Sequence, residues 1–323
     1  MNNITFPKLG LEFTISETAF NIGGFSIKWY AIIIMIGLLS AIIFGYKNAR
    51  KFGLDMELLN EPIFIATLSA IVAARAYYCI FNFSQFKDNP ISVFYIWEGG
   101  IAIYGAVIGA VLSGLIICKV RKLPFLACFD LVSLGFLIGQ GIGRWGNFVN
   151  AEAFGKNTTL PWGMSGTAIQ KDLYILSLND KSINPLEPVH PTFLYESLWC
   201  ILGFILLSLF IKHRRYDGQI ILMYMTWYGF ERMFVEGLRM DSLMIGNLRV
   251  SQLLSAVIFL FGLITLIVMN IKIKSKHDDE YLKLFVKTEA SAELIRKADA
   301  IREAEKAKSK KNKKTEEIEE NVD

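Results

Sequence analysis

Long apolar runs alternate with short polar loops along most of the chain. A helix needs about 20 apolar residues to cross the hydrocarbon core of a bilayer. Seven runs reach this length, and we expect a membrane span at each of them: 28–46, 60–82, 99–118, 126–149, 192–211, 219–237 and 250–271. The pattern predicts an all-α polytopic membrane protein with about seven transmembrane helices.

Basic residues collect in alternate loops between these runs. Loops 47–57, 119–124 and 212–218 each carry three Lys or Arg residues, and so does the start of the segment after 271. Loop 83–98 carries only Lys87. Because short loops rich in Lys and Arg stay in the cytoplasm, the pattern predicts an outer N-terminus and a cytoplasmic C-terminus.

Two segments outside the spans complete the organisation. Residues 150–191 are rich in Pro, Asn, Ser and Thr and predict a small irregular head on the outer surface. Residues 272–323 are rich in Lys, Glu and Ala, which is typical of a charged cytoplasmic tail, either helical or disordered. We therefore expect a transmembrane domain over 1–271 and a tail over 272–323. The first 25 residues have neither a basic start nor an Ala-x-Ala site, so no cleavable signal peptide is expected.

Composition supports a membrane protein and says little about other partners. The 323 residues are 53% hydrophobic, although the tail lowers that average, and the net charge of +4 is too small to indicate a nucleic-acid partner. The four cysteines lie within apolar runs without a Cys-x-x-Cys pair, which favours buried or lipid-facing thiols. Gly105 and Gly109 form a G-x-x-x-G pattern that favours close helix packing.

The first charged cluster is the segment 143–155, GRWGNFVNAEAFG, at the outer end of a predicted span. It brings Arg144, Asn147, Asn150 and Glu152 together beside several glycines. An arginine presents a rigid set of donors that fits a phosphate with two parallel hydrogen bonds. The alternative is an arginine that only extends from a helix end toward the interface.

A second cluster lies on the sixth predicted span, where Tyr228, Arg232, Glu236 and Arg239 are spaced by four, four and three residues. This spacing places them on one helix face. Polar side chains within a membrane usually face the bundle interior or a water-filled cavity. The alternative is a purely structural salt bridge between Arg232 and Glu236.

Two further groups of residues are less distinctive. The segment 190–196, HPTFLYE, carries His190 and Glu196 at the start of a span, where His190 is either a helix-capping residue or a functional one. Trp29 and Tyr30 are either interfacial aromatic residues or part of a site. Arg75, in the middle of an apolar run, either pairs helices or serves function.

These residues exclude several kinds of chemistry and favour one ligand. No metal-ligand spacing, no Ser-His-Asp set and no nucleotide-binding glycine loop is visible, so we expect neither a metal nor a cofactor. Two arginines on different helices, Arg144 and Arg232, predict an outward-facing cavity that binds an anionic lipid phosphate. A lipid or small-anion transporter and a membrane scaffold are the alternatives. However, no internal repeat is present, and a scaffold leaves the intramembrane arginines unexplained.

The segment GRWGNFVNAEAFG resembles the signature of the prolipoprotein diacylglyceryl transferase family. Further landmarks occur in the same order as in that family: Trp29–Tyr30, Arg75, Gly99–Gly100, HPTFLYE and the polar stripe of the sixth span. The resemblance covers roughly residues 25–270 and leaves the tail out.

The resemblance implies an enzyme of the bacterial inner membrane. Its substrates would be phosphatidylglycerol and prolipoproteins, and it would transfer the diacylglyceryl group to the lipobox cysteine thiol and release glycerol 1-phosphate. The implied catalytic residues are Arg144, Arg232, Tyr104, Glu152 and His190. The implied phosphatidylglycerol-binding residues are Arg144, Asn147, Asn150, Gly155, Tyr30, Tyr228, Arg232, Glu236 and Arg239.

The chain departs from the family pattern at two places. Some members carry a histidine, proposed as a base, where this chain has Tyr104, and glycines are common where it has Ala73–Ala74. A tyrosine has an ordinary pKa near 10, so we expect Tyr104 to stay protonated and to donate a hydrogen bond. The arginines would then favour the thiolate, with Glu152 or His190 as the proton acceptor.

The predicted topology can be tested by labelling single cysteines in intact cells. An impermeant reagent is expected to reach a cysteine placed near residue 170 and to miss one placed near residue 300, because the loop charges put these positions on opposite sides. The reverse labelling pattern would show that the orientation is wrong.

Overall fold

The computed structural model describes residues 2–23, 25–96, 99–241, 243–246, 248–275 and 283–319, with backbone only at 25 and 310–319. Residues 276–282, near the start of the expected tail, lie outside this described part. Contacts divide the chain into two units, one of residues 1–47 and 130–283, the other of 48–129 and 284–323. Each unit is described by itself below.

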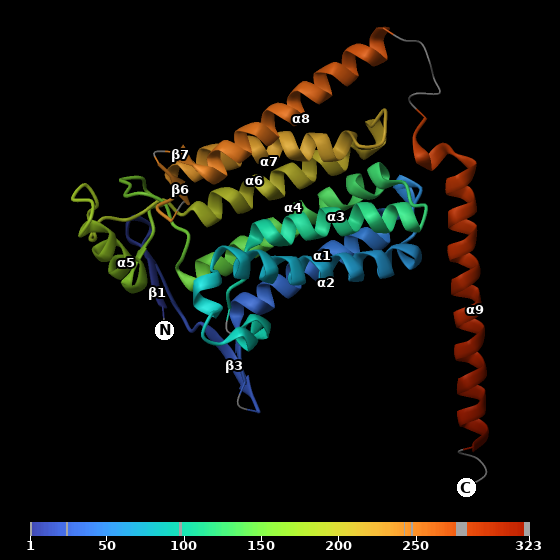
Figure 1. Ribbon diagram of the computed structural model, residues 1–323, viewed down its shortest axis with the longest axis horizontal. Coiled ribbons are helices and arrows are strands. Elements are labelled where there is room, and N and C mark those ends of the chain that lie inside the picture. Colours follow the sequence, from blue (N-terminus) through green and yellow to red (C-terminus); the bar gives the residue numbers. More distant parts are fainter. Residues whose placement is uncertain are drawn as a thin grey trace. The chain divides into compact units, whose positions relative to one another are not determined.

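Helices dominate the described chain (Figure 1). The long helices are α1 (Trp29–Asn48), α2 (Met56–Phe81), α3 (Ile103–Val120), α4 (Phe125–Asn150), α6 (Thr192–Phe210), α7 (Gln219–Leu238), α8 (Val250–Ser275) and α9 (Glu289–Glu319). All seven predicted spans are helices, and their ends differ from the prediction by at most four residues, as at α2, which begins at 56 rather than 60. The all-α polytopic class is confirmed.

Six of these helices are long and apolar enough to span a membrane by composition alone: α1, α2, α3, α4, α6 and α8. The remaining predicted span, α7, is a helix of 20 residues that carries Glu231, Arg232 and Glu236. These three charges lie within six residues of one another, and they make α7 the helix that contributes most to the site described below.

In the first unit, α7 packs along α8 and also contacts α6. Glycines set the distance between α7 and α8. A Cβ added at Gly229 would lie 2.9 Å from the backbone nitrogen of Phe259, and one at Gly262 would lie 2.6 Å from Oγ1 of Thr226. Because no real Cβ fits at such distances, these two glycines allow the close approach of the helices.

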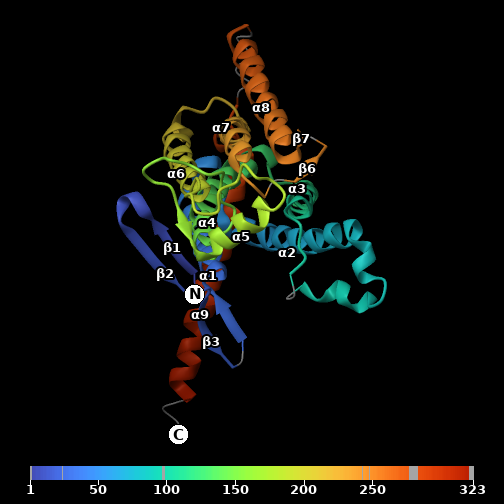
Figure 2. The same ribbon diagram turned by 90° about the vertical axis from the view of Figure 1, so that its left-hand side faces the viewer.

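The N-terminal residues of this unit form strands that the hydropathy pattern did not predict. β1 (Asn2–Phe6) pairs with β2 (Leu11–Ile15) and β5 (Ser165–Gly166), and β3 (Thr18–Ile22) pairs with β4 (Phe25–Lys28), which leads into α1 (Figure 2). Ile4 and Phe6 of β1 pack into a buried cluster with the short helix α5 (Thr167–Ser177) and the C-terminal end of α4. The expected head at 150–191 therefore shares its core with the N-terminus. The two short strands β6 (Met244–Ile245) and β7 (Leu248–Arg249) precede α8.

In the second unit, α2 and α3 pack closely at the predicted G-x-x-x-G pattern. A Cβ added at Gly105 would lie 2.5 Å from the carbonyl oxygen of Ala73, and one at Gly109 would lie 2.4 Å from Cβ of the same alanine. The helix-packing interpretation of these two glycines is confirmed.

All four cysteines of the chain are free and buried.

Arg75 on α2 holds the loop that precedes α3. Its guanidinium donates to four backbone carbonyls, those of Ser92 at 2.6 Å, Val93 at 2.8 Å, Gly99 at 2.7 Å and Gly100 at 2.8 Å. The residue is buried and lies against the rings of Tyr78 and Phe86. Because carbonyls buried without a donor are costly, Arg75 fixes the path of the loop into α3.

The tail helix α9 packs against residues 49–57 of the same unit. Ser291 is buried and donates its hydroxyl to the carbonyl of Gly53 at 2.9 Å. Gly53 has a φ of 76°, and a Cβ there would lie 2.4 Å from Oγ of Ser291 and 2.7 Å from Cα of Val286. A glycine at position 53 is therefore needed for two reasons: the backbone is left-handed there, and the tail packs too closely for a side chain.

This contact can be tested by changing Gly53 to Ala. We expect trypsin to cut the tail between residues 283 and 302 several times faster in this variant, because the methyl group displaces the start of α9. The matched control is Gly10→Ala, since Gly10 has a similar φ of 65° but open space around it. Both variants carry the strain of a left-handed alanine, roughly 1–2 kcal/mol. Equal cleavage rates of the tail in the two variants would contradict the contact.

Candidate active site: an arginine–carboxylate network between helices

One buried carboxylate, Glu196 on α6, binds arginines from two other helices. Its Oε2 lies 2.6 Å from Nη2 of Arg144 on α4 and 2.9 Å from Nη1 of Arg232 on α7. Its Oε1 lies 3.8 Å from Nη1 of Arg239, at the end of α7. Glu196 is 1% exposed. The two arginines that the sequence singled out therefore face the same carboxylate oxygen.

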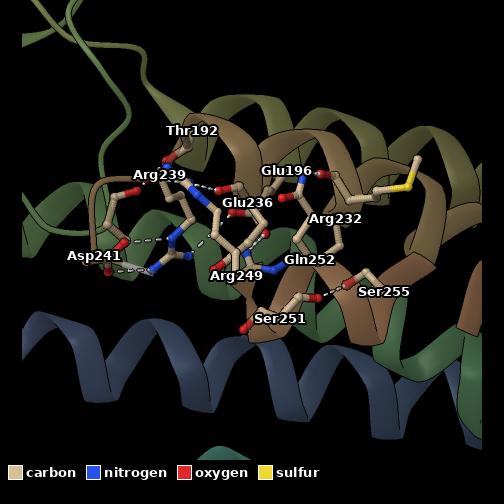
Figure 3. A network of polar contacts seen from close by, with 12 residues as sticks. Thr192, Glu196, Arg232, Glu236, Arg239, Asp241, Arg249, Ser251, Gln252 and Ser255 are labelled. Carbon is tan, nitrogen blue, oxygen red and sulfur yellow. Dashed lines mark hydrogen bonds and ion pairs between the residues drawn. The ribbon is translucent and has the colours of Figure 1, made fainter. Parts of the chain in front are cut away.

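Three residues of the predicted stripe, Arg232, Glu236 and Arg239, lie beside this carboxylate (Figure 3). Arg232 pairs with Glu236 at 2.5 Å, and Arg239 binds Asp241 through two hydrogen bonds of 2.9 and 2.7 Å. Arg249 donates to the carbonyls of Glu236 and Arg239, at 2.7 Å for the latter, and so closes the C-terminal end of α7. The salt bridge between Arg232 and Glu236, which the sequence offered as the structural alternative, is present, but it is one part of a larger network.

The guanidinium groups at the centre of the network keep some access to solvent. The side chains of Arg144, Arg232 and Arg239 are 18%, 15% and 13% exposed, whereas Glu196 and Glu236 are nearly inaccessible. Each guanidinium offers five N–H donors. The carboxylate contacts of Arg144 and Arg232 described above engage three of their nitrogen atoms. This arrangement can bind an anion and stabilise negative charge that develops on it.

The C-terminal end of α4 and the residues that follow it form a second polar group. Glu152 accepts hydrogen bonds from the side-chain amides of Asn147 at 2.9 Å and Asn150 at 3.3 Å. The chain here passes through two alanines with positive φ, Ala151 at 53° and Ala153 at 57°. Such strained residues persist only where the surroundings hold them in place, and they are common at functional sites. The three polar residues predicted from the signature segment are thus brought together.

Gly155 lies at a point where three segments meet. Its N–H donates to the carbonyl of His190 at 2.9 Å, and it forms a β-bridge with Arg239. A Cβ at this position would lie 2.8 Å from Cβ of His190 and 3.2 Å from Cγ2 of Thr192. The glycine therefore keeps the signature segment against both the start of α6 and the end of α7.

Two tyrosines, Tyr30 on α1 and Tyr228 on α7, lie near arginines of the network. Gly146 on α4 leaves room for the ring of Tyr30, because a Cβ at position 146 would lie 2.6 Å from Cδ2 of that ring. Tyr228 stacks on Tyr224 with the ring centroids 5.8 Å apart, and it lies within electrostatic range of Arg144 and Arg232. Tyr228 therefore lies near Arg232, which the helical spacing grouped with it, whereas Tyr30 lies near Arg144 rather than with Arg75, with which the sequence grouped it.

The ring of His190 lies in the head. Its Nδ1 is 3.1 Å from the hydroxyl of Tyr195, which accepts a hydrogen bond of 2.7 Å from Nε1 of Trp162. Burial lowers the pKa of His190 below its ordinary value, so the imidazole is neutral near pH 7. It connects to the arginine network through the backbone of Gly155, which bonds to the carbonyl of His190 and pairs with Arg239.

Tyr104, the fifth implied catalytic residue, lies in the first turn of α3 and belongs to the second unit. The loop that Arg75 holds leads directly into this turn. Its role in catalysis stays a prediction.

Three residues of the network were absent from the predicted site. Glu196 was noted only as a charge inside a span, and Asp241 and Arg249 lie just beyond α7.

Glu231 on α7 is a further charged residue close to the network. It is 6% exposed, neither oxygen has a hydrogen-bond partner among the described residues, and it is within electrostatic range of Glu196, Arg144 and Arg232. A glutamate next to an arginine inside an apolar run was the signal that could have found it.

A cavity of about 320 Å³ adjoins the network in the same unit. Its walls include the carboxylates of Glu152 and Asp241 together with the apolar side chains of Phe154 and Met240. Burial alone would raise the pKa of Asp241, but the paired guanidinium of Arg239 outweighs it and holds that pKa below its ordinary value. The cavity therefore has an apolar surface with a negatively charged edge.

Fold and site together define the class of protein. It is a multi-pass membrane protein in which charged residues of α4, α6 and α7 converge on one buried network. The family model described as prolipoprotein diacylglyceryl transferase matches residues 17–268. The chain belongs to this family and is a transferase.

Curated relatives support the same assignment. The chain is 41% identical to the phosphatidylglycerol–prolipoprotein diacylglyceryl transferase of Staphylococcus haemolyticus over 261 residues, covering 80% of this chain and 89% of that protein. It is 40% identical to the enzyme of that name from Clostridium novyi over 262 residues, covering 81% and 98%. The enzyme of that name from Thermotoga maritima is 41% identical over 254 residues, covering 78% and 84%.

The central position of Glu196 leads to a prediction about Glu196→Gln. The change keeps the shape but removes the charge that Arg144 and Arg232 share. Removing one partner of a buried ion pair costs about 3–5 kcal/mol. We therefore expect the apparent Tm in detergent to fall by on the order of 10 °C, with a loss of turnover. Glu187→Gln, at an exposed position in the head, is the control. An unchanged Tm for Glu196→Gln would show that the carboxylate does not hold the network together.

Proposed function

We propose that the protein transfers the sn-1,2-diacylglyceryl group of phosphatidylglycerol to the lipobox cysteine thiol of prolipoproteins and releases glycerol 1-phosphate. The single observation that carries this proposal is the position of Arg144 and Arg232 on one oxygen of Glu196. Two guanidinium groups at one buried point form a natural binding site for a lipid phosphate. The names of the curated relatives support these substrates.

In the proposed reaction, the thiol sulfur forms a bond to the glycerol carbon that carries the phosphate. The bond between that carbon and the phosphate oxygen breaks, and its electron pair leaves with glycerol 1-phosphate. Negative charge therefore grows on the phosphate, where Arg144 and Arg232 stabilise it in a site of low dielectric constant. The phosphatidylglycerol site around these two arginines is proposed to include seven further residues: Tyr30, Asn147, Asn150, Gly155, Tyr228, Glu236 and Arg239.

The thiol proton must also leave, because only the thiolate is an effective nucleophile. The positive field of the arginines favours the thiolate. Glu152 and the neutral imidazole of His190 are the proposed acceptors for the proton. Tyr104 is proposed to donate a hydrogen bond to a phosphate or ester oxygen and to keep its own proton.

The reaction can be tested with purified protein, phosphatidylglycerol and a synthetic lipobox peptide. The expected product is the peptide with one added diacylglyceryl group, detected by mass spectrometry, together with free glycerol 1-phosphate. A peptide with Ser in place of Cys and a reaction with phosphatidylcholine are the controls. Absence of product from a folded protein would reject the function, while lipid movement between leaflets without product would indicate a transporter.

The role of the arginines predicts the effect of lysine at these positions. Arg144→Lys and Arg232→Lys keep the charge but lose the paired donors of the guanidinium. Loss of one preorganised donor typically lowers the rate by a factor of about a hundred or more, and we expect at least this reduction in kcat/KM for each variant. Arg121→Lys is the matched control, because Arg121 is an exposed arginine that binds Glu61. Full activity of Arg144→Lys would rule out binding of the phosphate by a guanidinium.

The role of Tyr104 predicts the pH profile of Tyr104→Phe. If the hydroxyl only donates a hydrogen bond, the rate should fall about tenfold at every pH, the effect of one hydrogen bond to a charged group. The shape of the pH–rate profile should match that of the wild-type protein. A basic limb that disappears or shifts in the variant would show instead that Tyr104 titrates during the reaction.

A further inference from the structure

The first half of α9 is held against residues 49–57 by a cluster of charged side chains. Asp55 is 1% exposed and caps α2, where its Oδ1 accepts the backbone N–H of Glu57 at 3.1 Å. The same carboxylate pairs with Arg50 at 3.0 Å and with Arg302 of α9. Arg302 also lies 3.5 Å from Glu57. A buried carboxylate is costly unless its charge is compensated, and Arg302 shares this role with Arg50, so the ion pair with Asp55 helps to fix α9 at this position.

Apolar and close-packed contacts support the same placement. Ala298 is fully buried on α9, and the Gly53 turn accommodates Ser291 where no side chain would fit. Residues 49–57 lead directly into α2, a membrane-spanning helix by length and composition. The fixed half of α9 therefore lies where this unit leaves the membrane.

The direction of α9 follows from its own unit. In Figure 1, α2 and α3 run roughly parallel to each other, and α9 lies past one of their ends and is steeply inclined to both. Since α2 and α3 are membrane spans, a helix that is steeply inclined to them at their end extends along the membrane surface rather than away from it. Beyond Arg302, α9 continues to Glu319, about 25 Å at 1.5 Å per residue.

Within this second half of α9, the run 306–314 carries a dense positive charge, with Glu303 and Glu305 before it and Glu316, Glu317 and Glu319 after it. Lysines occupy six of the nine positions from 306 to 314, and no acidic residue interrupts them. No large apolar residue lies within this stretch either, so it is suited to electrostatic attraction rather than to insertion. Runs of four to eight basic residues beside a membrane span are typical of segments that bind anionic lipids.

We propose that the lysine run 306–314 is a binding surface for anionic lipid headgroups of the leaflet that borders residues 49–57. The docked half of α9 supplies the position, and the lysines supply the attraction to phosphate groups. This surface is separate from the arginine network, and the proposal does not depend on the transfer reaction. It assigns the tail an interaction with lipids of the same charge class as phosphatidylglycerol.

The proposal can be tested on the full-length protein in lipid nanodiscs. A fluorophore is attached through Asn312→Cys, because the four native cysteines are buried. Energy transfer is measured to an acceptor on a trace headgroup-labelled lipid, in discs of phosphatidylcholine alone and in discs with added phosphatidylglycerol. We expect transfer to rise at least twofold with phosphatidylglycerol. It should return to the phosphatidylcholine value near 1 M NaCl, where the screening length is about 3 Å.

Two controls make the outcome decisive. A label at Lys297→Cys, an exposed position on the docked half, should respond equally in both kinds of disc. A variant with Gln at all six lysines should lose the rise at position 312. Equal transfer in both kinds of disc, or a rise that survives the six substitutions, would overturn the proposal. So would a response at 312 that requires added RNA, which would assign the run to a nucleic acid.

Discussion

The structure depends on the neutralisation of buried arginines by Glu196. A guanidinium inside a membrane is costly unless a carboxylate or a ligand compensates it. Glu196 binds Arg144 from α4 and Arg232 from α7, and its second oxygen faces Arg239. One side chain of α6 therefore joins three helices. The same pairing holds the arginines in place before a substrate arrives, which is what stabilisation of a developing negative charge requires.

Glycines make room for this network. Gly155 lets the signature segment lie against His190, and Gly146 lets the ring of Tyr30 lie against α4 beside Arg144. On the far side of α7, Gly229 and Gly262 bring α8 close and keep the charged helix covered. These positions explain why a cluster of charges occurs beside so many small residues. The charges need a packed protein surface around them, and only small residues allow the backbones to approach closely enough.

Much of the site could be predicted from the sequence, because charges inside apolar runs are rare and easily recognised. Arg144, Arg232, Glu236 and Arg239 were found in this way, and the structure places them in one network. The sequence did not reveal which partner each charge has. Glu196 lies 36 residues from Arg232 in the chain, and nothing local shows that they meet. Glu231 was missed because it lies off the stripe that the helical spacing emphasised.

The sequence by itself determined the membrane class, the bounds of seven helices within four residues, the family and most of the charged residues of the site. These features depend on local hydropathy and on local sequence segments, which act over one helix at a time. Only the tertiary structure decided that the N-terminal strands complete the head, that Arg75 binds four carbonyls of a loop, and that Asp55 holds the tail through Arg302. Such contacts join residues far apart in the chain, and their partners are chosen by distance and burial in the folded protein, which no periodic pattern records.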